Sequence, residues 1–387
     1  MKSTIKLLLF LGVLFATSCS QPTDMLTVIN SDGSCYREFS EYADSAFLRG
    51  NTSPDHNPFP VEIDSTWRIG WSFKNSGLRT DFPLSKSTLD SILKLTSKEG
   101  STPETALSPR LKSKVNNLVF ARRNYKSVEG MDTTFRLKKS NEWSLIKVKH
   151  RLEKQFRWFY TYYTYRETYP MIKTGFALPI ENYMTKDEAM FWFTGKPNIL
   201  QSMNGLEMRE YLGKIEDSYN KWITQNLWNA EYKVLLNNYD SLSKKPVAKE
   251  QLQTLKDSIY NSKIKNLLDV DMEKVLNSFF KTDAFSELWK NENSPMKKFE
   301  KDFNKKFTFF FSQSFNYKLI LPGKIIQSGD AIIHGDTLVW KLSSYRLIPA
   351  DYVIEAQSRK ANLWAFILTG ILTLAAVVSF IWKPKGH

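Results

Sequence analysis

The last long stretch of the chain constrains its fold and its location most strongly. Residues 363–382 are apolar or small, and none of them is charged. At about 1.5 Å per residue, a helix of this length measures roughly 30 Å, which matches the hydrocarbon core of a bilayer. Trp364 and Trp382 stand near its two ends, where indole rings favour the membrane–water boundary. The stretch predicts a transmembrane helix over residues 361–382, because a core helix of this length normally keeps a polar face.

The first 18 residues have the layout of an export signal. Two lysines precede an apolar run over residues 7–16, which is too short for a spanning helix. The following Ala-Thr-Ser-Cys segment, residues 16–19, resembles a bacterial lipobox, in which the cysteine is lipidated. Ala16 departs from that pattern, because leucine is commonest there. We predict a signal peptide over 1–18, lipidation at Cys19 and a polar tether over 19–24, with plain cleavage after Ser18 as the alternative.

The two ends together predict where the protein resides. Outer-membrane proteins span as closed barrels, so a lone apolar helix argues for the inner membrane. The positive-inside rule does not settle orientation, because two basic residues precede the helix and two follow it. An exported N-terminus settles it instead. The expected location is a bacterial inner membrane, with the bulk of the chain in the periplasm and residues 383–387 in the cytoplasm.

The composition is that of a globular protein with excess positive charge. Of the 387 residues, 24% are charged and 42% are hydrophobic, and the net charge is +14. A basic domain beside a membrane is expected to face anionic headgroups or acidic proteins. The membrane ends, and the lack of a zinc-finger or RNP-type motif in the sequence, argue against a nucleic-acid partner.

Hydrophobic periodicity divides the remaining chain into strands, helices and strands again. Residues 25–183 are predicted to be β-rich, with a turn at residues 30–33 and a short helix over 87–95. Residues 184–306 repeat apolar side chains every three or four positions, most clearly over 206–236, and form a predicted helical lobe.

The strand pattern returns over residues 307–360, beginning with a long predicted strand over 308–321. The dipeptide Ser294-Pro295 predicts the start of the last helix before it. The predicted fold class is α+β. It has one mainly antiparallel sheet built from N- and C-terminal strands, an inserted helical lobe and one C-terminal transmembrane helix.

Aromatic side chains are dense between residues 156 and 169. They occupy both alternating positions of a strand-like run, which predicts a strand covered on both faces. Core packing explains such a run. The functional alternative is an aromatic surface that contacts a lipid or a glycan, with Trp158, Tyr160 and Tyr162 as the possible ligand contacts.

Sequence motifs for catalysis or metal binding are missing. The chain has no glycine-rich phosphate loop, no His-Glu-x-x-His and no Cys-x-x-Cys, and its four histidines are far apart in sequence. We expect no cofactor, no metal site and no catalytic residue. A carboxylate pair for glycoside hydrolysis depends on spatial arrangement, so a hydrolase stays as the least favoured alternative. Cys35 is expected to be a buried thiol.

Several short motifs carry a family resemblance. An early Asp32-Gly33-Ser34 follows the first strand, Leu321-Pro322-Gly323-Lys324 comes late, and a hairpin at residues 336–340 precedes the membrane helix. Together these motifs resemble the LppM-type group of tail-anchored bacterial lipoproteins. The resemblance covers about the first 40 mature residues and the last 80. It implies a mixed α/β domain at the cell envelope that binds lipid or a partner, with no established catalysis, and the helical middle departs from it.

A second resemblance concerns covalent modification. Seven Asp-Ser or Asp-Thr steps, each followed by Ala, Ile, Leu or Thr, are similar to the O-glycosylation signal of exported Bacteroidetes proteins. Asp-Ser is also common in turns, which accounts for several of them. The implied acceptors are Ser45, Ser65, Ser91, Thr133, Ser241, Ser258 and Thr337.

The first functional hypothesis is therefore a dual-anchored inner-membrane lipoprotein whose periplasmic domain acts as an envelope interaction or scaffold protein. The second is a lipid- or glycan-binding module that uses the aromatic strand region. The partners expected are the membrane, an envelope protein and a lipid or glycan.

Overall fold

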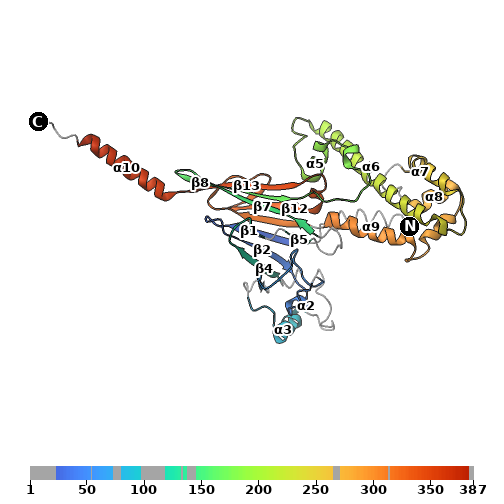
Figure 1. Ribbon diagram of the computed structural model, residues 1–387, viewed down its shortest axis with the longest axis horizontal. Coiled ribbons are helices and arrows are strands. Elements are labelled where there is room, and N and C mark those ends of the chain that lie inside the picture. Colours follow the sequence, from blue (N-terminus) through green and yellow to red (C-terminus); the bar gives the residue numbers. More distant parts are fainter. Residues whose placement is uncertain are drawn as a thin grey trace. The chain divides into compact units, whose positions relative to one another are not determined.

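A computed structural model describes residues 23–53, 55–72, 80–96, 118–131, 134–136, 145–264, 271–312 and 314–382 (Figure 1). The predicted signal peptide, Cys19, Thr133 and the predicted cytoplasmic tail lie outside these ranges. The chain folds into two compact units. The β-rich unit comprises residues 22–170, 314–342 and 352–387, and the helical unit comprises residues 171–313 and 343–351.

The β-rich unit contains a seven-stranded sheet in the order β11-β12-β9-β1-β2-β4-β3. Strand β1 pairs antiparallel with β2 but parallel with β9. The β1–β2 turn forms where the sequence predicts it, because Gly33 adopts a φ of 100°, which glycine allows at little cost. The strands are β1 (Thr23–Ile29), β2 (Cys35–Tyr42), β3 (Arg68–Ser72), β4 (Leu118–Tyr125), β9 (Ser314–Ile320), β11 (Ile332–His334) and β12 (Thr337–Ser343).

A second sheet of four strands has the order β10-β13-β8-β7. The prediction of a single sheet is therefore wrong, while the α+β class with mainly antiparallel pairing is confirmed; the parallel β1–β9 pair was not predicted. Strands β7 and β8 form a hairpin whose turn closes through two backbone hydrogen bonds between Arg157 and Tyr160, of 2.8 and 3.0 Å. The strands are β7 (Lys149–Phe156), β8 (Tyr160–Tyr169), β10 (Lys324–Gln327) and β13 (Tyr352–Ala361); a separate short pair joins β5 (Thr134–Arg136) and β6 (Leu145–Lys147).

Side chains from the inner faces of the two sheets form the core of this unit. Along β8, alternate residues from Tyr163 to Tyr169 are buried, and the residues between them are half-buried or exposed. Only one face of β8 is therefore fully covered, which corrects the prediction of a strand buried on both faces. The helices α2 (Ser45–Leu48) and α3 (Lys86–Thr96) belong to the same unit, and α3 confirms the helix predicted over 87–95.

A buried ion pair crosses between the two sheets. The guanidinium of Arg37 on β2 lies 2.9 Å from the carboxylate of Glu167 on β8, and both side chains are at most 2% exposed. The Nε of Arg37 also donates to Thr27 at 3.0 Å. The hydroxyls of Tyr165 and Tyr169 donate to the two carboxylate oxygens at 2.5 and 2.7 Å. The pair is thus hydrogen-bonded on both sides, as a buried charge requires.

The electrostatics of Glu167 follow from these neighbours. Burial acts to raise the pKa of its carboxyl, but the charges of Arg37 and His150 and the hydrogen bond from Tyr165 act against it. Together they lower the pKa of Glu167 to about 2. The carboxylate therefore stays charged at neutral pH inside the core.

Removal of this carboxylate should destabilise the protein strongly. Glu167→Gln is expected to lower the free energy of unfolding by about 3–5 kcal/mol, because Arg37 stays buried without its counter-charge. Urea unfolding of the full chain in detergent micelles, followed by near-ultraviolet circular dichroism, measures the loss. Glu355→Gln is the matched control: it breaks an exposed pair with Arg166 and should cost less than about 1 kcal/mol. Equal losses in the two variants would contradict the prediction.

The same carboxyl predicts a pH dependence of stability. Its pKa is about 2 in the folded protein, against 4.5 as the ordinary value. Its contribution is therefore complete above roughly pH 5 and is lost as the pH falls toward 2. The difference in unfolding free energy between the parent and Glu167→Gln should stay constant from about pH 7 to 5 and shrink below that. A difference that is unchanged at pH 3 would argue against the assignment.

The helical unit is built on α6 (Gly205–Asn238), which confirms the helix predicted over 206–236. Asn204 begins it with a capping box to Glu207, in which each side chain accepts a backbone N–H of the other residue. Its inner face packs into a core with the following helices, where Trp228 and Tyr232 are at most 1% exposed. The other helices are α5 (Lys186–Thr194), α7 (Lys249–Lys263), α8 (Met272–Phe280) and α9 (Pro295–Ser312), with 3-10 turns η1 (Ile180–Asn182), η2 (Tyr239–Ser241), η4 (Ala284–Trp289) and η5 (Ser344–Leu347).

Helix α9 begins at Pro295, as Ser294-Pro295 predicts, but it ends later than expected. It extends to Ser312, so the strand predicted over 308–321 is wrong in its first part, and β9 begins only at Ser314. The aromatic run has high strand propensity. Each further residue, however, extends an existing helix without a new nucleation step, and this outweighs the local preference.

Candidate functional site

The C-terminal helix α10 (Leu363–Ile381) is long and apolar enough to cross a membrane. Its 19 residues correspond to about 28 Å of helix. The most apolar window has a mean hydropathy of 2.3, and only 6% of that window is buried inside the protein. A helix so apolar and so exposed has no internal core to cover it, which distinguishes it from the helices of the helical unit.

One residue joins α10 to the four-stranded sheet. Strand β13 ends at Ala361 and α10 begins at Leu363, so α10 continues directly from the strand (Figure 1). Between them, Asn362 donates its backbone N–H to the carbonyl of Phe159 at 2.9 Å. Its side-chain amide donates to the carbonyls of Arg157 and Trp158 at 2.8 and 3.1 Å. Asn362 therefore fastens the start of α10 to the turn of the β7–β8 hairpin.

Aromatic rings from the hairpin turn pack against the first turns of α10. We call the four hairpin residues Phe156, Trp158, Phe159 and Tyr160 the aromatic collar. Trp158 meets Trp364 edge-on with ring centroids 5.3 Å apart, and its indole N–H donates to the Thr369 hydroxyl at 2.9 Å. The other contacts are Phe156 with Trp364 at 6.2 Å, Phe159 with Phe366 at 4.7 Å and Tyr160 with Phe366 at 5.8 Å.

The collar remains open to the surroundings despite these contacts. The side chains of Phe156, Trp158 and Phe159 are 58%, 45% and 37% exposed. Large aromatic rings with this exposure, gathered at one place beside an exposed apolar helix, mark a contact surface.

The three predicted ligand contacts lie on this hairpin. Trp158 is in the turn, and Tyr160 and Tyr162 follow it on β8. The guanidinium of Arg359 lies 4.7 Å from the ring centroid of Tyr160, and that of Arg157 lies 4.9 Å from the ring centroid of Tyr162. The structure thus brings the predicted residues together with basic side chains, next to α10.

The sequence reading missed Asn362 and Phe156 as members of this site. The signal for Asn362 was its position as the single polar residue between a strand and an uncharged helix. Phe156 belongs to the predicted aromatic run, but its exposure depends on the hairpin turn that follows it.

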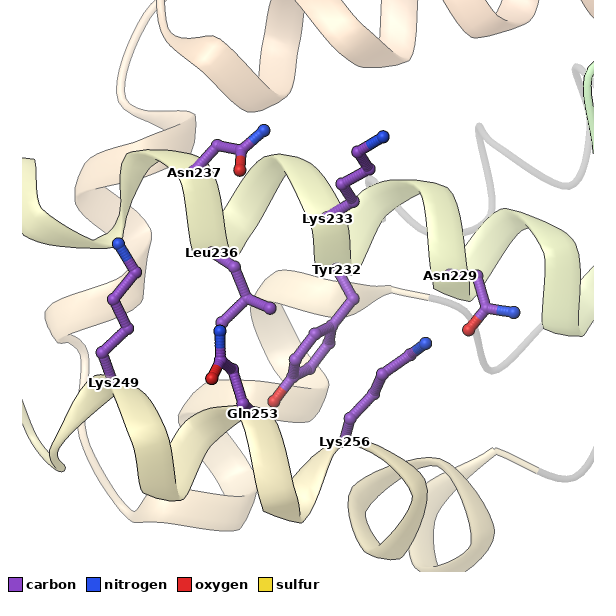
Figure 2. A pocket seen from close by; sticks show the side chains of 8 residues that line it. All are labelled: Asn229, Tyr232, Lys233, Leu236, Asn237, Lys249, Gln253 and Lys256. Atoms are coloured by element: carbon purple, nitrogen blue, oxygen red, sulfur yellow. The ribbon is translucent and has the colours of Figure 1, made fainter. Parts of the chain in front are cut away.

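A second candidate site lies in the helical unit, between α6 and α7. A groove of about 350 Å³ is lined mostly by polar side chains, which come from both helices. Figure 2 shows Tyr232, Leu236 and Gln253 between the helices, with Lys249 and Lys256 toward opposite ends. The lining residues are Asn229, Tyr232, Lys233, Leu236 and Asn237 from α6, and Lys249, Gln253 and Lys256 from α7.

Two of the three lysines that line the groove form no ion pair among the described residues. Lys249 pairs with Asp240 at 2.6 Å. Lys233 and Lys256 form no ion pair with any residue that the structure describes. The sequence reading missed these lysines, because single lysines are normal on any solvated helix face.

The predicted modification sites are spread over both units. Ser65, Ser91, Ser241 and Ser258 are exposed, and Ser45 and Thr337 are half-buried. The described sites lie on different helices, strands and turns. The glycosylation hypothesis stays a prediction. Cys35, the predicted buried thiol, is 2% exposed, and burial raises its pKa to about 11.

Within the described ranges, no group of three or more His, Cys, Asp or Glu residues lies close enough to hold a metal ion. His56 pairs with Asp44 at 2.8 Å, and His150 lies 3.7 Å from Glu167 in the core.

Comparison of the chain with models of known protein families, with curated proteins and with solved structures finds no match. The collar and the groove are therefore the features from which a function can be inferred.

The contacts of Asn362 predict a local change when they are removed. Asn362→Ala loses three side-chain hydrogen bonds, including one accepted from Thr161 at 2.9 Å. At about 0.5–1.5 kcal/mol each, amide hydrogen exchange in the hairpin turn should become at least tenfold faster. Gln357→Ala, which removes one side-chain bond to Thr164 on β8, should leave the turn unchanged. Unaltered exchange in Asn362→Ala would show that the turn is held by other contacts.

Proposed function

We propose that the protein is a membrane-anchored interaction protein of a bacterial cell envelope. It is held in the inner membrane by α10 and by lipidation at Cys19, with most of the chain in the periplasm and residues 383–387 in the cytoplasm. Its helical unit binds an acidic segment of an envelope protein. The lysine-lined groove between α6 and α7 is the observation that carries this proposal.

The chemistry of the groove favours an acidic partner. The ammonium groups of Lys233 and Lys256 form no ion pair with a described residue, and the side-chain amides of Asn229 and Gln253 can donate to carboxylate oxygens. The volume of about 350 Å³ suits a few side chains of a bound segment. The net charge of +14 adds long-range attraction for an acidic partner.

Apolar docking on the outer face of α6 has less support. A partner helix would need an exposed apolar stripe. Among the described residues of α6, Leu206 is the one large apolar side chain that is strongly exposed, at 66%. The remaining apolar residues of α6 face the core or are half-buried, so charge rather than apolar area distinguishes this surface.

The aromatic region supports a second candidate function, which is lipid contact. Its exposed rings adjoin α10, where a membrane surface would lie. A glycan is supported less well, because sugar stacking needs a free ring face, and the rings of Trp158 and Tyr160 already contact Trp364, Phe366 and Arg359.

A pair of charge reversals tests the groove. The purified full chain in detergent micelles is titrated with a fluorescein-labelled hexaglutamate peptide, and anisotropy gives the Kd. Lys233→Glu with Lys256→Glu is expected to raise the Kd at least tenfold, or about 1.4 kcal/mol. Lys214→Glu with Lys221→Glu is the matched control: both lysines are exposed on α6 outside the groove, and the net charge change is the same.

The groove assignment predicts three further features of that titration. A hexaglutamine peptide should not bind, the control double variant should change the Kd less than threefold, and binding should weaken as salt is raised from 50 to 300 mM. Equal loss of affinity in the two double variants would show general charge attraction and reject the groove as the binding site.

Cysteine labelling tests the topology. Gly386→Cys should react with a membrane-impermeant maleimide only after the inner membrane is permeabilised, because an exported N-terminus and one spanning helix place residue 386 in the cytoplasm. The parent chain measures background labelling of its two native cysteines. Labelling of Gly386→Cys in intact spheroplasts would contradict the proposed orientation.

A further inference from the structure

We propose that the turn of the β7–β8 hairpin is a second membrane-contacting element, which lies in the headgroup layer beside α10 and binds anionic phospholipid. The inference rests on the membrane insertion of α10 proposed above. It adds a surface of the β-rich unit that touches the bilayer, and it names the lipid class that this surface recognises.

The length of α10 determines the depth of the hairpin turn. Nineteen residues give about 28 Å of helix, and the hydrocarbon core measures about 30 Å. A spanning α10 therefore has no spare turn that could remain in water. Thr369 is six residues into the helix, or about 9 Å along its axis, and it accepts a hydrogen bond from the Trp158 indole at 2.9 Å. Asn362, which holds the turn, would lie at the membrane boundary, and Thr369 would lie about 9 Å inside it, so the Trp158 side chain must enter the membrane with α10.

The attachment of the turn to α10 is specific. Asn362 bonds to three consecutive carbonyls of the turn, those of residues 157, 158 and 159. These bonds, together with the ring contacts of the collar, hold the hairpin against the first turns of the helix. The hairpin cannot stay in solution while α10 enters the bilayer unless these contacts break.

The chemistry of the turn suits the interfacial layer. Phe156 and Phe159 present apolar rings, and Trp158 combines a large ring with an N–H that is already hydrogen-bonded to Thr369. Aromatic residues of this kind concentrate at membrane–water boundaries. Because the indole N–H has a partner within the protein, its transfer from water leaves no unsatisfied donor.

Basic side chains lie near the collar, and their charge favours a lipid with an anionic headgroup. Arg157 is in the turn, Lys154 is on β7, and Arg359 and Lys360 are the residues of β13 paired with Tyr162 and Thr161. Three of the four, Lys154, Arg157 and Lys360, are exposed, and Arg359 is half-buried. The nearest acid on β7, Glu153, is paired with Arg151 at 2.9 Å. Such a cluster beside a membrane helix attracts anionic headgroups.

Depth-dependent fluorescence quenching tests the location. The full chain is reconstituted into phosphatidylcholine vesicles with 30% phosphatidylglycerol, and an NBD label is attached at Phe156→Cys, Val353→Cys or Leu372→Cys. Nitroxides are placed at the lipid headgroup or at acyl carbon 12. The unsubstituted chain gives the background labelling of the native cysteines. Val353 is exposed at the other end of β13, and Leu372 is in the middle of α10.

We expect the label at position 156 to be quenched at least twofold more by the headgroup nitroxide than by the acyl-chain nitroxide. The label at 372 should show the reverse order, and the label at 353 should be quenched by neither. Quenching at 372 without quenching at 156 would overturn the inference while leaving the insertion of α10 intact. The absence of quenching at 372 would instead overturn the membrane anchor itself, so the two failures are distinguishable.

The lipid class is tested by the same label at position 156. In vesicles of phosphatidylcholine alone, its headgroup quenching should fall at least twofold. Lys154→Glu with Arg157→Glu should abolish the difference between the two vesicle compositions. Lys149→Glu with Arg151→Glu, two exposed residues at the start of the same strand, should preserve it. Equal quenching with and without phosphatidylglycerol in the parent would overturn recognition of anionic lipid.

Discussion

The pairing of β8 with β13 is the constraint on which the rest of the β-rich unit depends. Ten consecutive residue pairs join the strands, from Tyr352 opposite Tyr169 to Ala361 opposite Tyr160. The chain enters the helical unit after Pro170 and last returns from it before Tyr352, so this ladder closes a very long loop. Loop-closure entropy grows only slowly with length, and a continuous antiparallel ladder can offset it. The end of the ladder is also what brings the hairpin turn to the first residue before α10.

The buried Arg37–Glu167 pair can form only in the native register of β8. A slip of β8 by one residue would turn Glu167 out of the core and leave the Arg37 guanidinium buried without its carboxylate. Such a state is far less stable than the native one, whereas a slip between two apolar faces would be tolerated more easily. The register of β8 that satisfies the ion pair is also the register that places the hairpin turn and the aromatic collar against α10. Strand β8 thus carries both the buried Glu167 and, at its other end, the exposed hairpin turn.

We propose different partners for two basic sites on the protein. The groove in the helical unit offers ammonium groups and amides to a carboxylate-bearing segment, and the collar in the β-rich unit surrounds aromatic rings with basic side chains at the proposed bilayer surface. Exposed lysine contacts are individually weak and sensitive to salt. Attachment to a membrane offsets that weakness, because it raises the effective concentration of partners confined to the same surface. Weak binding in the groove would therefore suffice if the protein is anchored as proposed.

The sequence alone determined the features that depend on local pattern: the apolar length of α10, the amphipathic period of α6, the turn at Gly33 and the start of α9 at Pro295. It also indicated Trp158, Tyr160 and Tyr162 as an unusual aromatic group. Tertiary structure decided the rest. The end of α9, the parallel pairing of β1 with β9 and the division into two sheets depend on contacts between distant residues, for which local propensity gives no signal. The role of Asn362, and the meeting of the aromatic group with α10, likewise exist only because strand register brings together residues about 200 positions apart.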